Sequence, residues 1–178
     1  VTASVARWVL KICQGNKIGI YIGDISGAFD KVSRQLLLAK LAQLGVSASF
    51  LDFLNSYLES REGFVAVEGA LSECMLLTDM SYQGTVLGPC LWNAFFSDIA
   101  TCVPEGEQQA QIFADDLKID SHCPVHVSSD ILREGLREAQ HRAHEWGEHN
   151  RVCFDPTKES IHVLHPVHGD DTEFVLLG

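Results

Sequence analysis

Apolar residues recur at intervals of three and four along several stretches of the chain, and this spacing places them on one face of a helix. The longest such stretch has its core positions at Leu132, Leu136, Ala139, Ala143 and Trp146. Another stretch, directly after Pro89, is strongly apolar, and a proline costs little in the first turn of a helix because its missing N–H would be unpaired there. We therefore expect helices over residues 4–14, 33–44, 49–60, 90–102 and 128–149.

Two of these helices have recognisable boundary residues. Ser33 can cap the helix over 33–44, and Gly45 can end it. Ser49 with Asp52 resembles a capping box, in which side chains satisfy the free N–H groups of the first turn. We expect that box to start the next helix.

Short runs rich in β-branched and aromatic residues predict strands. Single strands are predicted over 17–23, 161–164 and 173–177. Two hairpins are predicted as well: 64–68 with 74–78 around a GALS turn, and 109–114 with 117–120 around Asp115-Asp116. Helices are inserted between the hairpins rather than alternating regularly with strands. We therefore expect an α+β fold, with an antiparallel sheet, helices packed on one face and the other face open.

Asp115 and Asp116 stand side by side directly after the apolar run AQIFA. Like charges repel, so such a pair is kept either at a solvated turn or around a cation. Asp24 stands at the carboxyl end of the strand predicted over 17–23, and it can meet this pair if the two strands are neighbours. Three carboxylates on one rim would suit a hard divalent cation such as Mg²⁺.

Composition narrows the classes of protein that fit. The 178 residues are 46% apolar, enough for one sizeable core, so we expect a single domain over 1–178. No apolar stretch reaches the roughly 18 residues of a membrane span, and no signal peptide is visible, so we expect no membrane partner and an intracellular location. The six cysteines form no CxxC pair, which favours a reducing compartment.

The net charge of −11 argues against a protein that holds nucleic acid by itself, because phosphate affinity comes from clustered Lys and Arg. The thirteen basic residues are spread along the chain. Any polynucleotide contact must then be local, metal-mediated or completed by another part of a larger protein.

Three motifs follow one another along the chain. DISGAFDKV at 24–32, QGTVLGPCLWN at 83–93 and FADD at 113–116 resemble the first, second and third catalytic motifs of reverse transcriptases of the non-LTR retrotransposon type. The helix and strand over 128–164 resemble the segment that follows in that family. Each motif alone is weak, but their combination and order are specific. The chain departs from the family at Met80-Ser81-Tyr82, where the family has Gly-Val-Pro.

The resemblance covers nearly the whole chain, and it implies a partial polymerase palm with fingers and thumb largely missing. It also implies catalytic roles. Asp24 and Asp115 would bind both of two Mg²⁺ ions, which Mn²⁺ could replace, with Asp116 beside them and the main-chain carbonyl of Ile25 as a further ligand. Lys158 would act as a general acid near the departing pyrophosphate. The alternative for Lys158 is an exposed lysine at a strand edge.

Ile25 and three further residues would contact the substrate. Phe29 matches the aromatic residue that lies under the incoming sugar and clashes with a ribose 2′-hydroxyl, and its alternative is an ordinary core phenylalanine. Gln83 and Gly84 match the pair that lies along the nascent base pair, where a glycine lets the backbone approach closely. The alternative for this pair is a plain loop before a helix.

The implied function is RNA-directed DNA polymerisation, in which deoxynucleotides are transferred to a primer 3′-hydroxyl by a two-metal mechanism. The implied partners are an RNA template, a DNA primer, deoxynucleoside triphosphates, and the missing fingers, thumb and endonuclease regions of a parent polyprotein. A nuclear location is expected from the family alone. Two alternatives stay open: a catalytically inactive, decayed or repurposed palm acting as a binding module, and a metal-dependent phosphohydrolase built on the same acids.

Other polar clusters have simpler interpretations. We expect a solvated helix face, rather than a metal site, from His141, His144, Glu145, Glu148 and His149. We expect turn, cap or surface acids at Asp30, Asp98, Asp120 and Asp170-Asp171.

Overall fold

The computed structural model describes residues 2–78, 81, 84–103, 108–167 and 169–174. Its contacts divide the chain into two compact units, which are described separately below. The first unit comprises Val1–Ser26, Asp98–His149 and Cys153–Gly178, and the second comprises Gly27–Ser97 and Asn150–Val152. The single domain expected over 1–178 stays a prediction.

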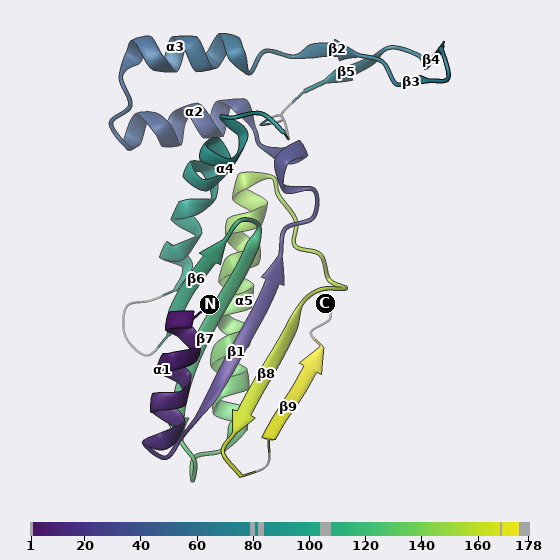
Figure 1. Ribbon diagram of the computed structural model, residues 1–178. Coiled ribbons are helices and arrows are strands. Elements are labelled where there is room, and N and C mark those ends of the chain that lie inside the picture. The colour runs from purple at the N-terminus through teal and green to yellow at the C-terminus, as the bar shows by residue number, and fades with distance from the viewer. Residues whose placement is uncertain (1, 79–80, 82–83, 104–107, 168, 175–178) are drawn as a thin grey trace. The chain divides into compact units, whose positions relative to one another are not determined.

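The first unit is built on an antiparallel sheet with β1 at its centre (Figure 1). Within the described residues, the strands follow the order β6 (Gln109–Phe113), β7 (Asp116–Pro124), β1 (Asn16–Asp24), β8 (Ser160–His165) and β9 (Gly169–Phe174). Every neighbouring pair is antiparallel, so the predicted α+β class with an antiparallel sheet is confirmed. The strand predicted over 173–177 begins earlier, at Gly169, and residues 175–178 lie outside the described residues.

Helix α5 (Ser129–Asn150) covers one face of this sheet, because its apolar stripe is buried there. The packing is close: a Cβ atom at Gly19 of β1 would lie 2.8 Å from the Leu136 Cδ1 atom. Side chains alternate between the two faces of a strand. Ile18, Ile20, Ile22 and Asp24 therefore lie on the face of β1 away from α5.

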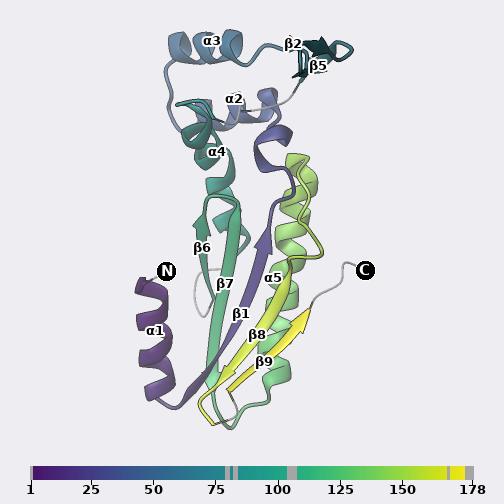
Figure 2. The same cartoon turned by 45° about the vertical axis from the view of Figure 1, so that its right-hand side comes forward.

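Helix α1 (Thr2–Cys13) lies against that second face (Figure 2). Arg7 forms an ion pair with Asp120 of β7, and the Ser4 hydroxyl donates a hydrogen bond to Gln111 of β6. The expectation of helices on one face thus holds for α5, while α1 adds a helix on the other face. Asp120, expected as a turn, cap or surface acid, is only 5% exposed, because its partner Arg7 comes from a distant part of the chain.

The second unit contains three α-helices and a short 3₁₀ helix in its described residues. They are η1 (Ala28–Lys31), α2 (Arg34–Gln43), α3 (Ala48–Tyr57) and α4 (Gly88–Phe96). Their core includes Leu37, Leu54 and Trp92, all at most 1% exposed. The Lys40 Nζ atom donates a hydrogen bond of 2.8 Å to the Phe95 carbonyl, which ties α2 to α4.

Two helix boundaries differ from the prediction. α3 begins at Ala48 with Ser47 as its N-cap residue, so the Ser49–Asp52 capping box is wrong. The helix predicted over 90–102 ends as an α-helix at Phe96 and continues as the 3₁₀ helix η2 (Ser97–Cys102). The Ser97 and Thr101 hydroxyls there donate hydrogen bonds to carbonyls three residues earlier, which competes with regular helix bonding.

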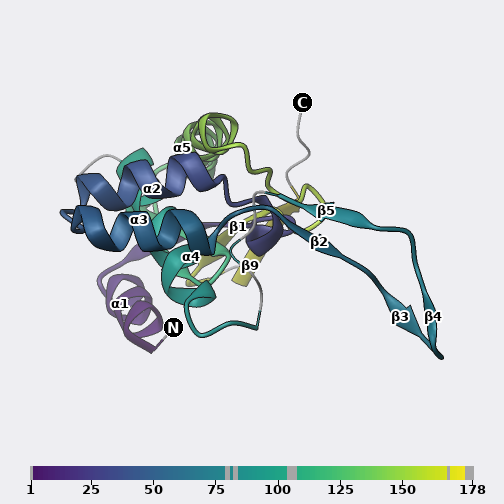
Figure 3. The ribbon, with the colours of Figure 1, turned by 90° about the horizontal axis from the view of Figure 1, so that it is seen from above.

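A β-hairpin follows α3 in the second unit, and Figure 3 shows its two arms side by side. Its pairs are β2 (Arg61–Gly63) with β5 (Met75–Leu77) and β3 (Ala66–Val67) with β4 (Ala70–Leu71). The turn lies at Glu68-Gly69, with φ angles of 49° and 84°, rather than at the predicted GALS. A two-residue turn with both φ angles positive matches the twist of the strands better than a longer one.

No helix in the described ranges combines the length and the apolar composition that crossing a bilayer requires.

Candidate active site

The β6–β7 hairpin presents the paired acids at one end of the sheet. Phe113 pairs with Asp116, which leaves Ala114 and Asp115 as a two-residue turn. Ala114 has a φ of 54°, a left-handed conformation that a residue with a Cβ rarely adopts. Asp115 thus lies in the turn, while Asp116 is already the first residue of β7.

Strand pairing brings Asp24 to the same place. Asp24 at the end of β1 stands opposite Asp116 in the β1–β7 register. The Ile25 N–H donates a hydrogen bond of 3.3 Å to the Asp115 carbonyl just beyond this pair. The condition set by the sequence, that these two strands be neighbours, is therefore met. The three carboxylates belong to one corner of the first unit.

The electrostatics of this corner reflect the crowding of negative charge. Burial raises the pKa of Asp116 above its ordinary value, and the charges of Asp115 and Asp24 raise it further. Lys118 and Lys158 act in the opposite direction. Like charges this close favour the protonated carboxyl until a cation compensates them.

Lys158 supplies one such cation. It lies in the turn before β8, and its Nζ atom donates a hydrogen bond of 2.6 Å to the Asp24 Oδ2 atom. The Lys158 side chain is 59% exposed, whereas that of Asp24 is 12% exposed. The hydrogen bond to Asp24, followed by charge attraction, raises the pKa of Lys158. Lys158 therefore contacts a candidate catalytic carboxylate instead of standing at a strand edge.

The turn that carries Lys158 is shaped by Asp155, which the sequence analysis missed. The Asp155 N–H donates a hydrogen bond of 2.9 Å to the Asp24 carbonyl. The Asp155 carboxylate accepts hydrogen bonds from the Thr157 N–H and hydroxyl, at 3.0 and 2.6 Å, which lower its pKa. The Asp-Pro-Thr sequence could have indicated this turn, since an Asp side chain often accepts a hydrogen bond from the backbone N–H two residues later.

A buried carboxylate anchors the strand that follows this turn. Glu159 is 0% exposed and accepts hydrogen bonds from Tyr21 at 3.2 Å and from Gln140, while its Oε1 atom lies 2.9 Å from His144 Nε2. Burial, followed by the Glu159 charge, raises the pKa of Tyr21, so the phenol keeps the proton that it donates. His144 was expected on a solvated face; it is half-buried because α5 turns it toward Glu159. The adjacent opposite charges of Lys158 and Glu159 were the feature of the sequence that could have indicated this buried cluster.

The donor atoms at this corner fit a hard divalent cation in their chemistry. The carboxylates of Asp24, Asp115 and Asp116 and the carbonyl of Ile25 offer only oxygen, which Mg²⁺ prefers. Among the described residues, no group of three or more His, Cys, Asp or Glu side chains is arranged to hold a metal ion. The Asp24 carboxylate is instead arranged around the Lys158 ammonium.

Of the residues expected to contact substrate, Ile25 belongs to the first unit, and Phe29 and Gly84 belong to the second. Phe29 lies in η1, half-buried, with its ring centroid 5.9 Å from that of Trp92. Its carbonyl accepts a hydrogen bond of 2.9 Å from the Ser81 N–H. Gly84 is exposed and has a φ of 83°, which favours glycine. Gln83 lies outside the described residues.

Comparisons with known proteins point in one direction. Residues 9–168 match the family model described as reverse transcriptase (RNA-dependent DNA polymerase). The RNA-directed DNA polymerase from mobile element jockey of Drosophila funebris is 33% identical over 130 residues, which cover 69% of this chain and 14% of that protein. Its namesake in Drosophila melanogaster is 31% identical over 143 residues, covering 79% of this chain and 15% of that protein. The chain thus spans about one seventh of the length of these relatives.

Solved structures share the fold at low sequence identity. The apo telomerase from Candida tropicalis, truncated from the C-terminal domain, has a TM-score of 0.63 at 11% identity, covering 98% of this chain and 40% of that chain. The telomerase from Candida tropicalis in complex with a TWJ fragment of telomeric RNA has a TM-score of 0.57 at 10% identity, covering 96% of this chain and 29% of that chain. Both likenesses concern the arrangement of the backbone.

Proposed function

Because the chain belongs to the reverse transcriptase family, we propose that it supplies the catalytic palm of an RNA-directed DNA polymerase. In this reaction the 3′-hydroxyl of a DNA primer on an RNA template attacks the α-phosphorus of a deoxynucleoside triphosphate. A phosphodiester bond forms, the hydroxyl loses its proton, and pyrophosphate leaves. The observation that carries the proposal is the register that sets Asp24 opposite Asp116, with Asp115 in the adjoining turn.

Asp24 and Asp115 would hold two Mg²⁺ ions, for which Mn²⁺ could substitute, with Asp116 and the Ile25 carbonyl beside them. When bound, such ions lower the pKa of the attacking hydroxyl and stabilise the charge on the leaving oxygens. Lys158 would hold a proton for the departing pyrophosphate, and its ammonium already lies on the same corner of the sheet.

Phe29, Gln83 and Gly84 would contact the incoming nucleotide and the nascent base pair. The positive φ of Gly84 supports a position where the backbone can approach a substrate without a Cβ in the way. The ring of Phe29 is supported from one side by Trp92, which suits a rigid platform for a sugar.

Primer extension in the full-length protein tests this function. We expect Asp115→Asn to reduce extension with Mg²⁺ by roughly a hundredfold or more, because the loss of a ligand charge removes several kcal/mol of electrostatic stabilisation. Asp52→Asn makes the same chemical change on the exposed surface of α3 and should leave the rate unchanged. Equal extension by the wild type and Asp115→Asn would eliminate the proposed role of Asp115.

The same assay separates the other candidates. Triphosphate or phosphodiester hydrolysis without primer extension would identify a metal-dependent phosphohydrolase. A folded wild-type protein with neither activity would favour a catalytically inactive palm. The presence of all three acids and of Lys158 in one corner supports retained chemistry.

A further inference from the structure

A cavity of about 390 Å³ opens in the first unit next to the acids. It lies on the face of the sheet that α1 contacts, since Ser4 of α1 forms part of its wall. The side chains used below are among its lining residues: Ser4, Ile22, Gln111, Phe113, Asp116 and Lys118. Its mixed lining of apolar and charged groups is unlike a simple packing defect, which would be apolar throughout.

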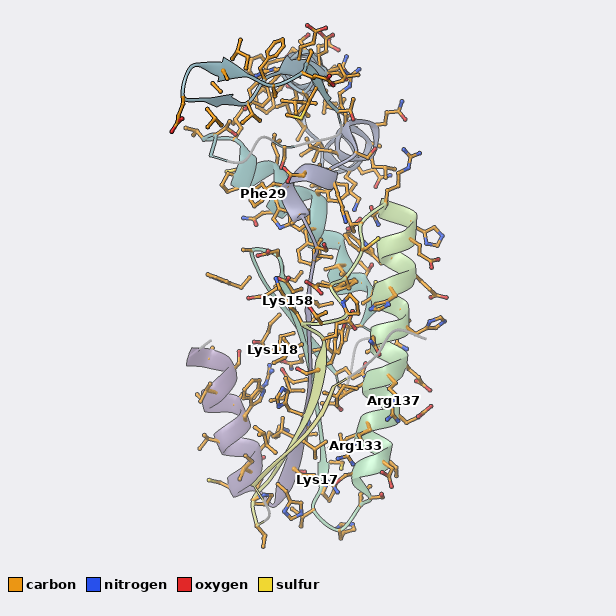
Figure 4. All side chains as sticks on the ribbon, turned by 90° about the vertical axis from the view of Figure 1, so that its right-hand side faces the viewer. Lys17, Phe29, Lys118, Arg133, Arg137 and Lys158 are labelled. Carbon is orange, nitrogen blue, oxygen red and sulfur yellow. The ribbon has the colours of Figure 1, made fainter. Side chains whose placement is uncertain are left out.

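Lys118 is the cation among the described residues that line this cavity. In the sheet register it stands opposite Ile22 of β1 and Gln111 of β6, two residues along β7 from Asp116. Side chains two residues apart share a face of a strand, so Lys118 and Asp116 point to the same side. Figure 4 shows Lys118 on the α1 side of the sheet, with Arg137 on α5 at the opposite side.

The ammonium of Lys118 differs in its contacts from those of Lys17 and Lys158. Lys158 donates to Asp24, and Lys17 donates to the Val127 carbonyl and the Ser129 hydroxyl. Lys118 is half-buried with its Nζ atom 5.8 Å from the Trp8 ring centroid, and among the described residues it has no hydrogen-bond or ion-pair partner. A half-buried ammonium with open donors is suited to an anion that arrives from outside.

The surrounding charges indicate which anion this would be. An approaching phosphate meets Asp24, Asp115 and Asp116, and their repulsion must be offset locally because the chain carries a net charge of −11. Phe113, 76% exposed at the cavity wall, adds an aromatic surface beside the ammonium. An ammonium for a phosphate next to a ring for a sugar or base is the combination that recognises a nucleotide unit.

We propose that Lys118 binds a phosphate group of the nucleic acid or nucleotide that occupies the cavity beside Asp116. The proposal rests on the polymerase function proposed above. The phosphate can come from the backbone of the primer–template duplex or from the incoming triphosphate. The chemistry is shared, and the two arms of the following test separate the sources.

The first arm measures binding without chemistry. A fluorescein-labelled RNA–DNA hybrid oligonucleotide is titrated with the full-length protein in EDTA, and fluorescence anisotropy is recorded between about 50 and 200 mM salt. We expect Lys118→Gln to weaken binding roughly threefold to tenfold at the lowest salt and to reduce the slope of log K against log salt by about one. Lys118→Arg, which keeps the charge, should bind like the wild type.

A matched control uses Arg137→Gln, which removes a cation from the exposed surface of α5, away from the cavity. It should leave affinity and slope unchanged. Far-UV circular dichroism of each variant checks that the sheet is folded. A loss of binding in Arg137→Gln equal to that in Lys118→Gln would mean that charge anywhere on the unit suffices, and this would overturn the proposal.

The second arm titrates dATP into the same proteins by isothermal titration calorimetry. Weaker dATP binding by Lys118→Gln with unchanged oligonucleotide binding would assign the phosphate to the nucleotide, and the reverse result would assign it to the duplex. Unchanged affinity and slope for both ligands would overturn the proposal. Neither arm depends on catalysis, so a failure of the Asp115→Asn prediction would remove the polymerase function without deciding this binding role.

Discussion

Phe29 combines a packing contact with a proposed role in substrate selection. Its ring packs at 37° to the ring of Trp92, as a core aromatic does, yet the residue is only half-buried. The family resemblance places an aromatic side chain here to exclude ribose. The packing supports the ring from behind and leaves part of it exposed, so the two interpretations are compatible.

Shortening this side chain tests the selection role. We expect Phe29→Val to raise ribonucleotide incorporation relative to deoxyribonucleotide incorporation by roughly tenfold or more, because the ring that meets the 2′-hydroxyl is gone. The measurement is the ratio of kcat/KM for matched ribo- and deoxyribonucleoside triphosphates in the full-length protein.

Phe50→Val serves as its control, since Phe50 is 45% exposed on α3 and loses the same atoms. An unchanged ratio in Phe29→Val, accompanied by lower stability, would leave Phe29 with a packing role alone. The candidate acids were identified from their motifs, but Lys118 was missed, because its proposed role rests on the cavity beside it and on the absence of a hydrogen bond or ion pair to its ammonium among the described residues.

At the scale of elements, one buried carboxylate links the residue before β8 to α5 and β1. Glu159 lies directly before β8, and its oxygens meet Gln140 and His144 of α5 and Tyr21 of β1. Helix, central strand and the Lys158 turn are therefore held by a single polar cluster in the interior. A buried network of this kind is stable only while every group has a partner.

Removing the acceptor should destabilise the protein strongly. We expect Glu159→Ala to lower the free energy of unfolding by about 2–4 kcal/mol, because three buried or half-buried donors lose their partner, and Glu159→Gln to cost less. Urea denaturation followed by circular dichroism gives the value. Glu148→Ala, on the exposed face of α5, is the control, and a loss in Glu159→Ala no larger than in that control would show that the cluster adds nothing to stability.

Helices were predicted more accurately than hairpins, and the reason is physical. The spacing of Leu132 and Leu136 is a local pattern that does not depend on which sheet the helix packs against. The ends of α5 were therefore predicted to within a residue or two. The hairpin turn at Glu68-Gly69 depends on which residues pair across it, and that pairing is decided between strands rather than within one. Ser47, which the prediction did not include, is the N-cap residue of α3 in place of the predicted Ser49.

At the scale of the whole molecule, the β6–β7 hairpin was predicted, but the order of the other strands and the second covered face were not. α1 reaches that face through Arg7, which a sequence pattern places in solvent, and Asp120 is buried as a result. Burial raises the pKa of Asp120 above its ordinary value of 3.8 and outweighs the attraction of Arg7. The folded protein then holds this proton more tightly than the unfolded chain, so stability falls as the pH rises through the folded-state pKa.

Asp120→Asn removes this titration. Relative to the wild type, we expect the variant to gain free energy of unfolding as the pH rises from below 3.8 toward neutrality, because the wild type loses the stability that its protonated Asp120 supplies. Urea unfolding measured at several pH values follows the difference. Asp130→Asn, whose side chain is 87% exposed, should show no such trend, and a difference for Asp120→Asn that is constant with pH would contradict the assignment.

The two-residue turn between β6 and β7 limits how this hairpin can change over evolution. Successive side chains of a strand point to opposite faces of the sheet. The pairing of Phe113 with Asp116 therefore decides which face each later residue of β7 occupies. One inserted or deleted residue at the turn would send Asp116 and Lys118 to the side filled by α5. Substitutions in this hairpin can therefore accumulate gradually, while changes in its length are tolerated only where they keep each side chain of β7 on its present face of the sheet.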